Sequence, residues 1–254
     1  MSKGLYSFVL EDDLFVEYHK FMNPHDSSGD YDKDIIKKLL SYHVYPFLYN
    51  KKQIDRININ ISDSLRRQLN HASCRNYDLT KLVDETIFKC VLSTNKDEYP
   101  YININSDKIK TTVTGTFFST ENRDKAISHI ARLCNDAKTI TVYDKYLSKE
   151  EAKELCGLLP KRKGLSIRIH DKDIIEKTSK TYCFSDVESV LNTNCEDWHI
   201  EPYNLLVNSH HDRYLIIDDK LAIILTSGFA NLFNDTREIT YIVSPVAKNP
   251  LIRT

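Results

Sequence analysis

The chain has few of the residues that interrupt regular structure, with 6 glycines and 7 prolines among 254 residues. So low a content excludes a collagen-like or low-complexity chain and predicts that most of it folds into helices and strands. Hydrophobic residues make up 41% and charged residues 28%, as in ordinary globular proteins. The length is sufficient for one large domain or two small ones.

Long hydrophobic runs are absent as well. No stretch approaches the roughly 18 apolar residues that a membrane-spanning helix needs. Acidic residues occur early, at Glu11, Asp12 and Asp13, which is unlike a secretory leader. We therefore expect a cytoplasmic protein without a transmembrane segment.

The six cysteines form no C-x-x-C pair and show no spacing typical of metal ligands. We expect reduced thiols and no metal or other cofactor. A formal net charge of −1 argues against a protein that coats nucleic acid by bulk electrostatics. The basic clusters at Arg66-Arg67 and at 161–163 are interpreted as solvated faces.

Residues 1–108 are expected to form a smaller α+β region, and their pattern indicates no function. Residues 32–45 carry an apolar stripe at helical spacing that should end before Pro46. Residues 57–61 alternate between isoleucine and asparagine, which predicts a half-buried strand. The other expected elements are a short helix capped by Ser62 or Asp63 and strands over 86–93 and 99–104.

Residues 109–254 alternate more regularly between strand-like and helix-like segments. Strands are expected over 109–118, 139–143, 165–169, 205–208, 213–218, 221–225 and 238–243, and helices over 120–133, 149–158 and 185–191. This order indicates an α/β fold with βαβ units and a mixed, partly parallel sheet flanked by helices on both faces. Such sheets bind ligands beyond the ends of their strands.

The most informative segment is His211-Asp-Arg213, with Asp218 following five residues after the arginine. Residues two apart on a strand point to the same face, so His211 and Arg213 can address one substrate group. A guanidinium binds two phosphate oxygens at once, and an imidazole can attack phosphorus or transfer a proton. The segment therefore predicts phosphate chemistry.

Small polar residues and a carboxylate follow one strand later, at Thr226, Ser227, Gly228, Asn231 and Glu238. With the His-Asp-Arg segment they resemble the H-x-K-x4-D motif of the phospholipase D superfamily and its Gly-Ser, Asn and Asn-x-Glu sequel. Arginine stands for the family's lysine, Ser-Gly inverts Gly-Ser, and Asp235-Thr-Arg-Glu replaces Asn-x-Glu with altered spacing. A closer resemblance, over roughly 110–245, is to the phospholipase D-like C-terminal domain of eukaryotic MIT proteins, which also carries a single His-Asp-Arg.

The resemblance implies that residues 109–254 form a phospholipase D-like domain and that the protein is a metal-independent phosphodiesterase, with a nuclease preferred. In that chemistry one histidine forms a phosphohistidine and a second protonates the leaving oxygen. Because the chain holds one such motif, the second histidine would come from another copy. The resemblance therefore implies a homodimer with a composite site on its two-fold axis.

By the same resemblance, the catalytic residues are His211, Arg213, Asp218 and Glu238, and the substrate-binding residues are Thr226, Ser227 and Asn231. Glu238 would orient an imidazole, while Asp218 would hold the motif loop in shape. His210 is interpreted as a helper or a surface residue. His170-Asp-Lys172, a second H-x-K string, lacks the aspartate and is interpreted as a strand end.

A non-catalytic reading stays open. Arginine keeps the positive charge of the family's lysine but is larger and planar, so it can bind phosphate and crowd an in-line attack. The chain would then be a module of the MIT C-terminal type that binds phosphates of nucleic acid or lipid, or a protein partner. The neutral net charge favours this module, whereas the retained Asn231 and Glu238 favour the enzyme, with nucleic acid preferred over lipid as ligand.

Overall fold

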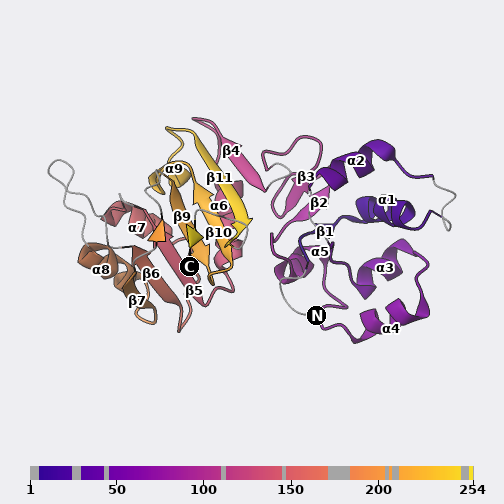
Figure 1. Cartoon of the computed structure of the whole chain (residues 1–254), viewed down its shortest axis with the longest axis horizontal. Helices are drawn as coiled ribbons and strands as arrows, with labels where there is room; N and C mark the ends of the chain where they lie inside the picture. The colour runs from indigo at the N-terminus through magenta and orange to yellow at the C-terminus, as the bar shows by residue number, and fades with distance from the viewer. Residues whose placement is uncertain are drawn as a thin grey trace. The chain divides into compact units, whose positions relative to one another are not determined.

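The computed structural model describes residues 6–24, 30–42, 46–109, 113–144, 147–170, 184–203, 206–207, 212–246 and 252–253. The chain divides into two compact units, Met1–Thr112 and Val113–Thr254. Each unit has its own sheet (Figure 1). Each also has its own buried apolar cluster.

In the N-terminal unit the described residues form a three-stranded parallel sheet in the order β1-β2-β3. Val9 of β1 pairs with Val91 of β2, and Leu92 pairs with Ile102 of β3. The strands are β1 (Val9–Leu10), β2 (Val91–Ser93) and β3 (Tyr101–Asn103). The helices are α1 (Asp12–Met22), α2 (Lys33–Ser41), α3 (Lys51–Ile57), α4 (Asp63–His71) and α5 (Leu79–Leu82), followed by a 3-10 turn (Val83–Glu85).

Side-chain caps begin three of these helices. Asp32 accepts the N–H groups of Asp34 and Ile35 at the start of α2. Ser62 accepts that of Leu65 at the start of α4, as its position in the sequence predicts. Asn50 similarly accepts the N–H of Gln53 at the start of α3.

The predicted strand over 57–61 is wrong. Ile57 is the last residue of α3, and Asn58 ends the helix with a φ of 52°, in the left-handed region. Asparagine tolerates this conformation and is common at helix ends. The alternation of isoleucine and asparagine therefore belongs to a helix end and a turn, since no partner strand meets it among the described residues.

In the C-terminal unit the described residues form a seven-stranded mixed sheet in the order β4-β11-β10-β9-β5-β6-β7. The strands β5, β6 and β7 are parallel to one another, and the pairs from β5 through β9, β10 and β11 to β4 are antiparallel. The bounds are β4 (Thr114–Phe117), β5 (Thr139–Tyr143), β6 (Ser166–His170), β7 (His199–Tyr203), β9 (Arg213–Ile217), β10 (Leu221–Leu225) and β11 (Ile239–Pro245). A separate ribbon pairs β8 (Leu206–Val207) with β12 (Ile252–Arg253).

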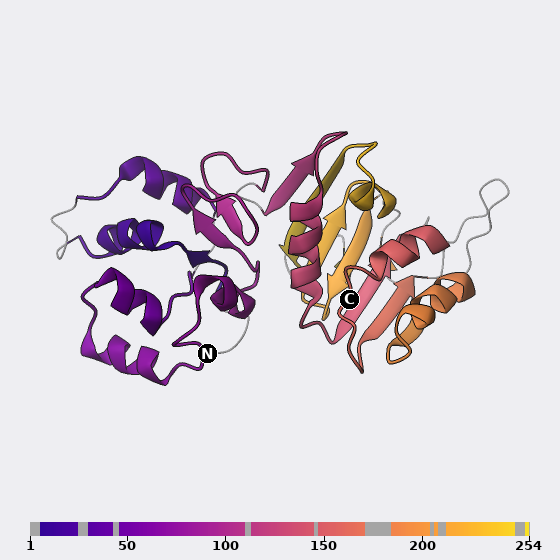
Figure 2. The ribbon, with the colours of Figure 1, turned by 180° about the vertical axis from the view of Figure 1, so that it is seen from behind.

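The helices of this unit are α6 (Asp124–Cys134), α7 (Lys149–Leu155), α8 (Phe184–Asn194) and α9 (Ala230–Phe233). In Figure 2, α6, α7 and α8 lie in front of the sheet on one face. Helix α6 connects β4 to β5, α7 connects β5 to β6, and α8 connects β6 to β7, and each connection moves across the sheet in the same direction. Because such crossovers are right-handed, all three helices lie on the same face. The expectation of helices on both faces is therefore wrong for the described residues. The antiparallel half of the sheet needs no crossover helix.

The two faces of the sheet bury different side chains. Beneath the helices, His129 of α6 is fully buried, and its Nδ1 lies 2.9 Å from the hydroxyl of Tyr241 on β11. A side chain at Gly115 on β4 would collide with the Tyr241 ring, so this close approach requires glycine. The opposite face carries a buried cluster formed by Tyr143, Tyr214, Ile216, Ala222 and Val246.

Two further observations concern the described residues. None of their helices combines the length and the apolarity that crossing a membrane requires. Trp198 is buried, and its indole nitrogen donates to the carbonyl oxygen of Pro160 at 3.2 Å, which makes it a core residue.

Candidate functional site

Most of the polar residues that their spacing singled out lie at one end of the strands of the seven-stranded sheet. The alternating strand directions bring the carboxyl ends of β5, β6 and β10 to the same edge as the amino ends of β9 and β11. The register places Arg213 opposite Leu225, which lies opposite Tyr241 on β11. On the other side, Tyr214 pairs with Tyr143 at the end of β5. We call this the motif edge.

Arg213 is held at the motif edge by a buried carboxylate. Its Nε lies 3.5 Å from Oδ1 of Asp144, the residue that follows β5. The Asp144 side chain is 2% exposed and that of Arg213 is 16% exposed, so solvent screens the pair weakly. The other carboxylate oxygen accepts the N–H of Phe229 at 3.3 Å. Asp144 therefore joins the start of β9 to the turn after β10.

That turn contains the predicted small polar residues. Thr226 exchanges hydrogen bonds with the backbone of Thr240, and its N–H donates to Thr240 at 3.0 Å. The Ser227 hydroxyl donates to the carbonyl oxygen of Glu238 at 3.4 Å. Asn231 lies in α9, where its N–H donates to the carbonyl oxygen of Gly228 at 3.0 Å. Thr226, Ser227 and Glu238 thus lie at the same end of the sheet as Arg213, on the side toward β11.

Glu238 lies just before β11 and is exposed. The chain leading to it is fixed by Arg123, which is buried and whose Nη2 donates to the carbonyl oxygens of Phe118 at 2.9 Å and Arg237 at 2.7 Å. The Arg123 guanidinium also lies 5.5 Å from the centre of the Phe117 ring. The chain segment just before Glu238 is therefore held against the end of β4.

Asp218 does not join the motif edge. It follows the last residue of β9, whereas Arg213 is the first residue, so the two occupy opposite ends of the strand. Its Oδ1 accepts the N–H groups of Lys138 and Thr139, both at 2.8 Å, and its φ is 51°. These hydrogen bonds hold the end of β9 against the start of β5, so the contacts of Asp218 are structural ones.

His211 and its neighbour His210 lie outside the described residues, so their positions come from the sequence alone. His170 is the last residue of β6, which confirms its interpretation as a strand end. Its ring packs on that of Tyr143, with centroids 4.5 Å apart. Tyr143 contacts the Tyr214 ring in turn, and adjacent strand residues alternate faces, so His170 lies on the face opposite Arg213.

Tyr214 follows Arg213 in β9, and its side chain lies on the opposite face of the sheet. Burial raises the pKa of Tyr214 to about 12, with a smaller contribution from the negative charge of Asp212. The Tyr214 phenol therefore stays neutral at physiological pH.

The residue that the sequence pattern missed is Asp144. Its available signal was a carboxylate directly after the apolar strand Thr139–Tyr143, at the edge where such sheets bind ligands. A cation held at a strand end by a buried carboxylate is suited to an anionic oxygen ligand. The hydroxyls of Thr226 and Ser227 at the same end of the sheet already donate to backbone carbonyl oxygens. No group of three or more potential metal ligands occurs among the described residues.

Comparisons with known proteins add little to this geometry. No family model and no curated protein matches the chain. Among solved structures, the chain is similar to NucT from Helicobacter pylori, with a TM-score of 0.32 and 10% sequence identity. The match covers 53% of this chain and 86% of that one. A likeness this distant carries no argument about the motif edge.

Proposed function

We propose that the C-terminal unit is a phospholipase D-like domain whose motif edge binds and cleaves a phosphodiester without a metal ion, with nucleic acid as the preferred substrate. The observation that carries the proposal is the position of Arg213. It is a mostly buried cation at a strand end, held by Asp144, which also accepts the N–H of Phe229 in the turn that follows Thr226 and Ser227. A preorganised guanidinium suits the charge that develops on phosphoryl oxygens.

Each residue of the motif has a role in this proposal. Arg213 binds the phosphoryl oxygens, and His211, two residues earlier, attacks phosphorus or protonates the leaving oxygen. Thr226, Ser227 and Asn231 add hydrogen bonds, and Glu238 orients an imidazole. Asp218 acts at a distance by keeping β9 in register with β5, through its bonds to Lys138 and Thr139.

The direct test is hydrolysis of a chromogenic phosphodiester and of single-stranded and duplex DNA and RNA. We expect the activity to persist in excess EDTA, because the described residues offer no cluster of metal ligands and the proposed chemistry uses none. The rate with chelator should lie within a factor of about two of the rate without it. Activity that disappears with EDTA and returns with Mg²⁺ would place the chemistry at a different site.

Two histidines are needed on one phosphate, and the chain carries one such motif. We therefore propose a homodimer in which the motif edges of two copies meet at the symmetry axis. Light scattering at tens of micromolar should give about twice the mass of 29.6 kDa. A mixture of His211→Ala and wild-type chains should lose activity as hybrids form. A strict monomer that still cleaves diesters would contradict the composite site.

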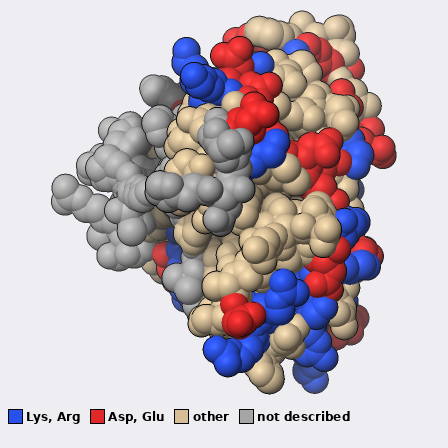
Figure 3. All heavy atoms as spheres, turned by 90° about the vertical axis from the view of Figure 1, so that its right-hand side faces the viewer, with Lys and Arg blue, Asp and Glu red and all other residues tan. Residues whose placement is uncertain are grey.

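A binding module is the second candidate, and the Arg213–Asp144 ion pair favours it. The carboxylate offsets part of the positive charge that a catalytic site would use on the phosphoryl group. The formal net charge of −1 also supplies no bulk attraction for a polyanion, and the face in Figure 3, which belongs mainly to the N-terminal unit, shows both signs interspersed. Such a module would bind nucleic acid, lipid phosphates or a protein partner with no turnover in any of the hydrolysis assays.

A further inference from the structure

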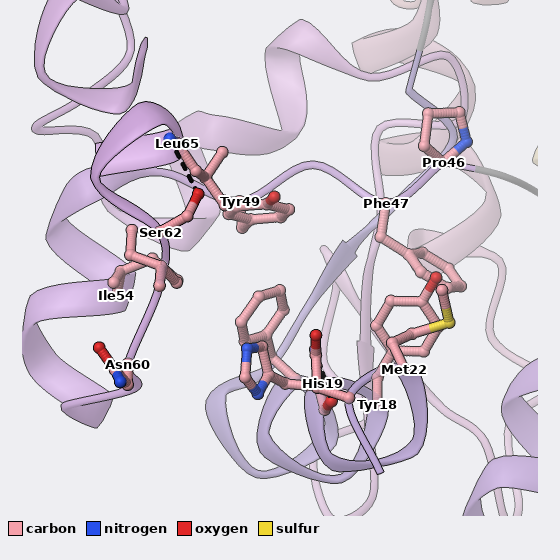
Figure 4. Close-up of a pocket in the computed structure, with 13 residues that line it drawn as sticks. Tyr18, His19, Met22, Pro46, Phe47, Tyr49, Ile54, Asn60, Ser62 and Leu65 are labelled. Carbon is pink, nitrogen blue, oxygen red and sulfur yellow. Dashed lines mark hydrogen bonds between the residues drawn. The ribbon is translucent and has the colours of Figure 1, made fainter. Parts of the chain in front are cut away.

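The N-terminal unit contains a pocket of about 700 Å³ that is unrelated to the motif edge (Figure 4). Its volume lies within the range of small-molecule sites, about 300–1,000 Å³. Helix α1 forms one wall, and the segment before α3, helix α3 itself and the start of α4 form the others. The lining residues are Phe15, Tyr18, His19, Met22, Asn23, Pro46, Phe47, Tyr49, Ile54, Asn60, Ile61, Ser62 and Leu65.

The lining contains no lysine, arginine, aspartate or glutamate, although charged residues make up 28% of the chain. An ionised group placed in such surroundings would lose its hydration without gaining a partner. Burial also raises the pKa of Tyr49, with a smaller contribution from Tyr6, so its phenol stays neutral. The part of a ligand that enters this pocket is therefore uncharged, which excludes a phosphate.

Aromatic rings form much of the wall and are already braced by one another. The Phe15 and Tyr49 rings lie 4.9 Å apart between centroids. Those of Tyr18 and Phe47 lie 5.1 Å apart in an edge-to-face arrangement. Rings fixed in this way lose little further freedom on binding and offer surfaces on which a flat ring can stack.

Polar groups lie at the rim of the same pocket. In Figure 4 the imidazole of His19 on α1 and the amide of Asn60, which precedes α4, come from different walls of the pocket, with Ser62 close to Asn60 in the chain. Asn60 and Ser62 are exposed. An amide presents both donors and an acceptor, which matches the edge of a heterocycle and has no counterpart on a hydrocarbon chain.

From these observations we propose that this pocket binds a neutral nucleobase, presented as a nucleoside or an unpaired nucleotide, with the base stacked among the aromatic side chains and its edge on Asn60 and His19. Stacking on fixed rings accepts any base, whereas hydrogen bonds to its edge select among them. The inference does not rest on the proposed phosphodiesterase activity, since the residues that carry it belong to the other unit.

The test uses the full chain titrated with adenosine, guanosine, cytidine and uridine, followed by calorimetry and saturation-transfer NMR. Leu65→Trp would fill the pocket from α4 and leave too little room for the base, so we expect it to weaken nucleoside binding at least about tenfold. The matched control is Gln68→Trp, an exposed position on the same helix that does not line the pocket. Asn60→Ala should weaken binding by about threefold or more through the lost edge contact.

Each outcome either supports or overturns the nucleobase proposal. Binding of at least one nucleoside that survives Gln68→Trp and Arg213→Ala but not Leu65→Trp supports the proposal. If Leu65→Trp does not fold, as judged by circular dichroism, the exposed Asn60→Ala decides instead. The proposal is overturned if no nucleoside binds, if Leu65→Trp and Asn60→Ala leave affinity unchanged, or if 1-octanol binds where nucleosides do not. None of these results depends on whether the protein cleaves diesters.

Discussion

Replacing His211 by alanine is expected to abolish turnover of a phosphodiester while leaving substrate binding nearly intact. The imidazole acts on the reacting atoms, so its loss appears in kcat, by at least roughly 10²-fold. Arg213→Ala should instead damage both binding and kcat. The binding loss should be about 1.5–3 kcal/mol, the contribution of a charge-assisted hydrogen bond. Steady-state kinetics and equilibrium binding of the same diester measure the two effects separately.

His210→Ala is the matched control, because it removes the neighbouring imidazole from the adjacent position in the chain. Its kcat and affinity should stay near those of the wild type. For a binding module there is no turnover to lose, and Arg213→Ala should weaken the ligand far more than His211→Ala does. If both variants behave like the wild type in every hydrolysis and binding assay, the assignment of the motif edge fails.

Of the variants described, Asp144→Ala, which removes a buried negative charge, is expected to lower the free energy of unfolding the most. Truncating one partner of a buried ion pair typically costs about 3–5 kcal/mol, because the other charge is left uncompensated. Arg213 retains 16% exposure of its side chain, so we expect a value near the low end, about 3 kcal/mol, for Asp144→Ala. Urea denaturation with an unchanged m-value would measure it. Asp144→Asn should lose less, since its amide oxygen can still accept from Phe229.

Asp219→Asn provides the comparison. Asp219 pairs with Arg168 at 3.2 Å, but its side chain is 45% exposed. Exposed pairs contribute about 0–1 kcal/mol, so this variant should unfold at nearly the wild-type urea concentration. Equal losses for Asp144→Ala and Asp219→Asn would mean that Asp144 does not hold Arg213 in the way described.

Short apolar runs were the most predictable part of the fold. The strands β5 and β10 have the predicted bounds, 139–143 and 221–225, because each is a short run of mainly apolar or β-branched residues bounded by polar residues. The strand β7, His199–Tyr203, was not predicted. Its sequence contains Pro202, which argues against a strand, yet β7 pairs on one side with β6 and ends the described sheet. An edge position tolerates a proline.

The candidate site was predictable where it is local in sequence and not where it depends on strand pairing. The spacing of Arg213, Thr226 and Ser227 can be seen in one stretch of chain. Asp144 meets Arg213 because β5 pairs with β9 in a particular register, and no spacing in the sequence contains that information. The reverse holds for Asp218, which is near Arg213 in sequence but is separated from it by the length of β9.

The parallel pairing of Val9 with Val91 affects how the N-terminal unit acquires its structure. All five helices described in this unit lie between these two strands in the sequence. During synthesis β1 therefore leaves the ribosome long before β2, and in the interval, of the described residues, only the segment near Leu48 can bond to its backbone. Closing so long a loop has a large entropic cost, and folds rich in distant contacts form slowly. Until β2 arrives, the buried residues Phe8, Val9 and Leu10 remain available to chaperones or to aggregation.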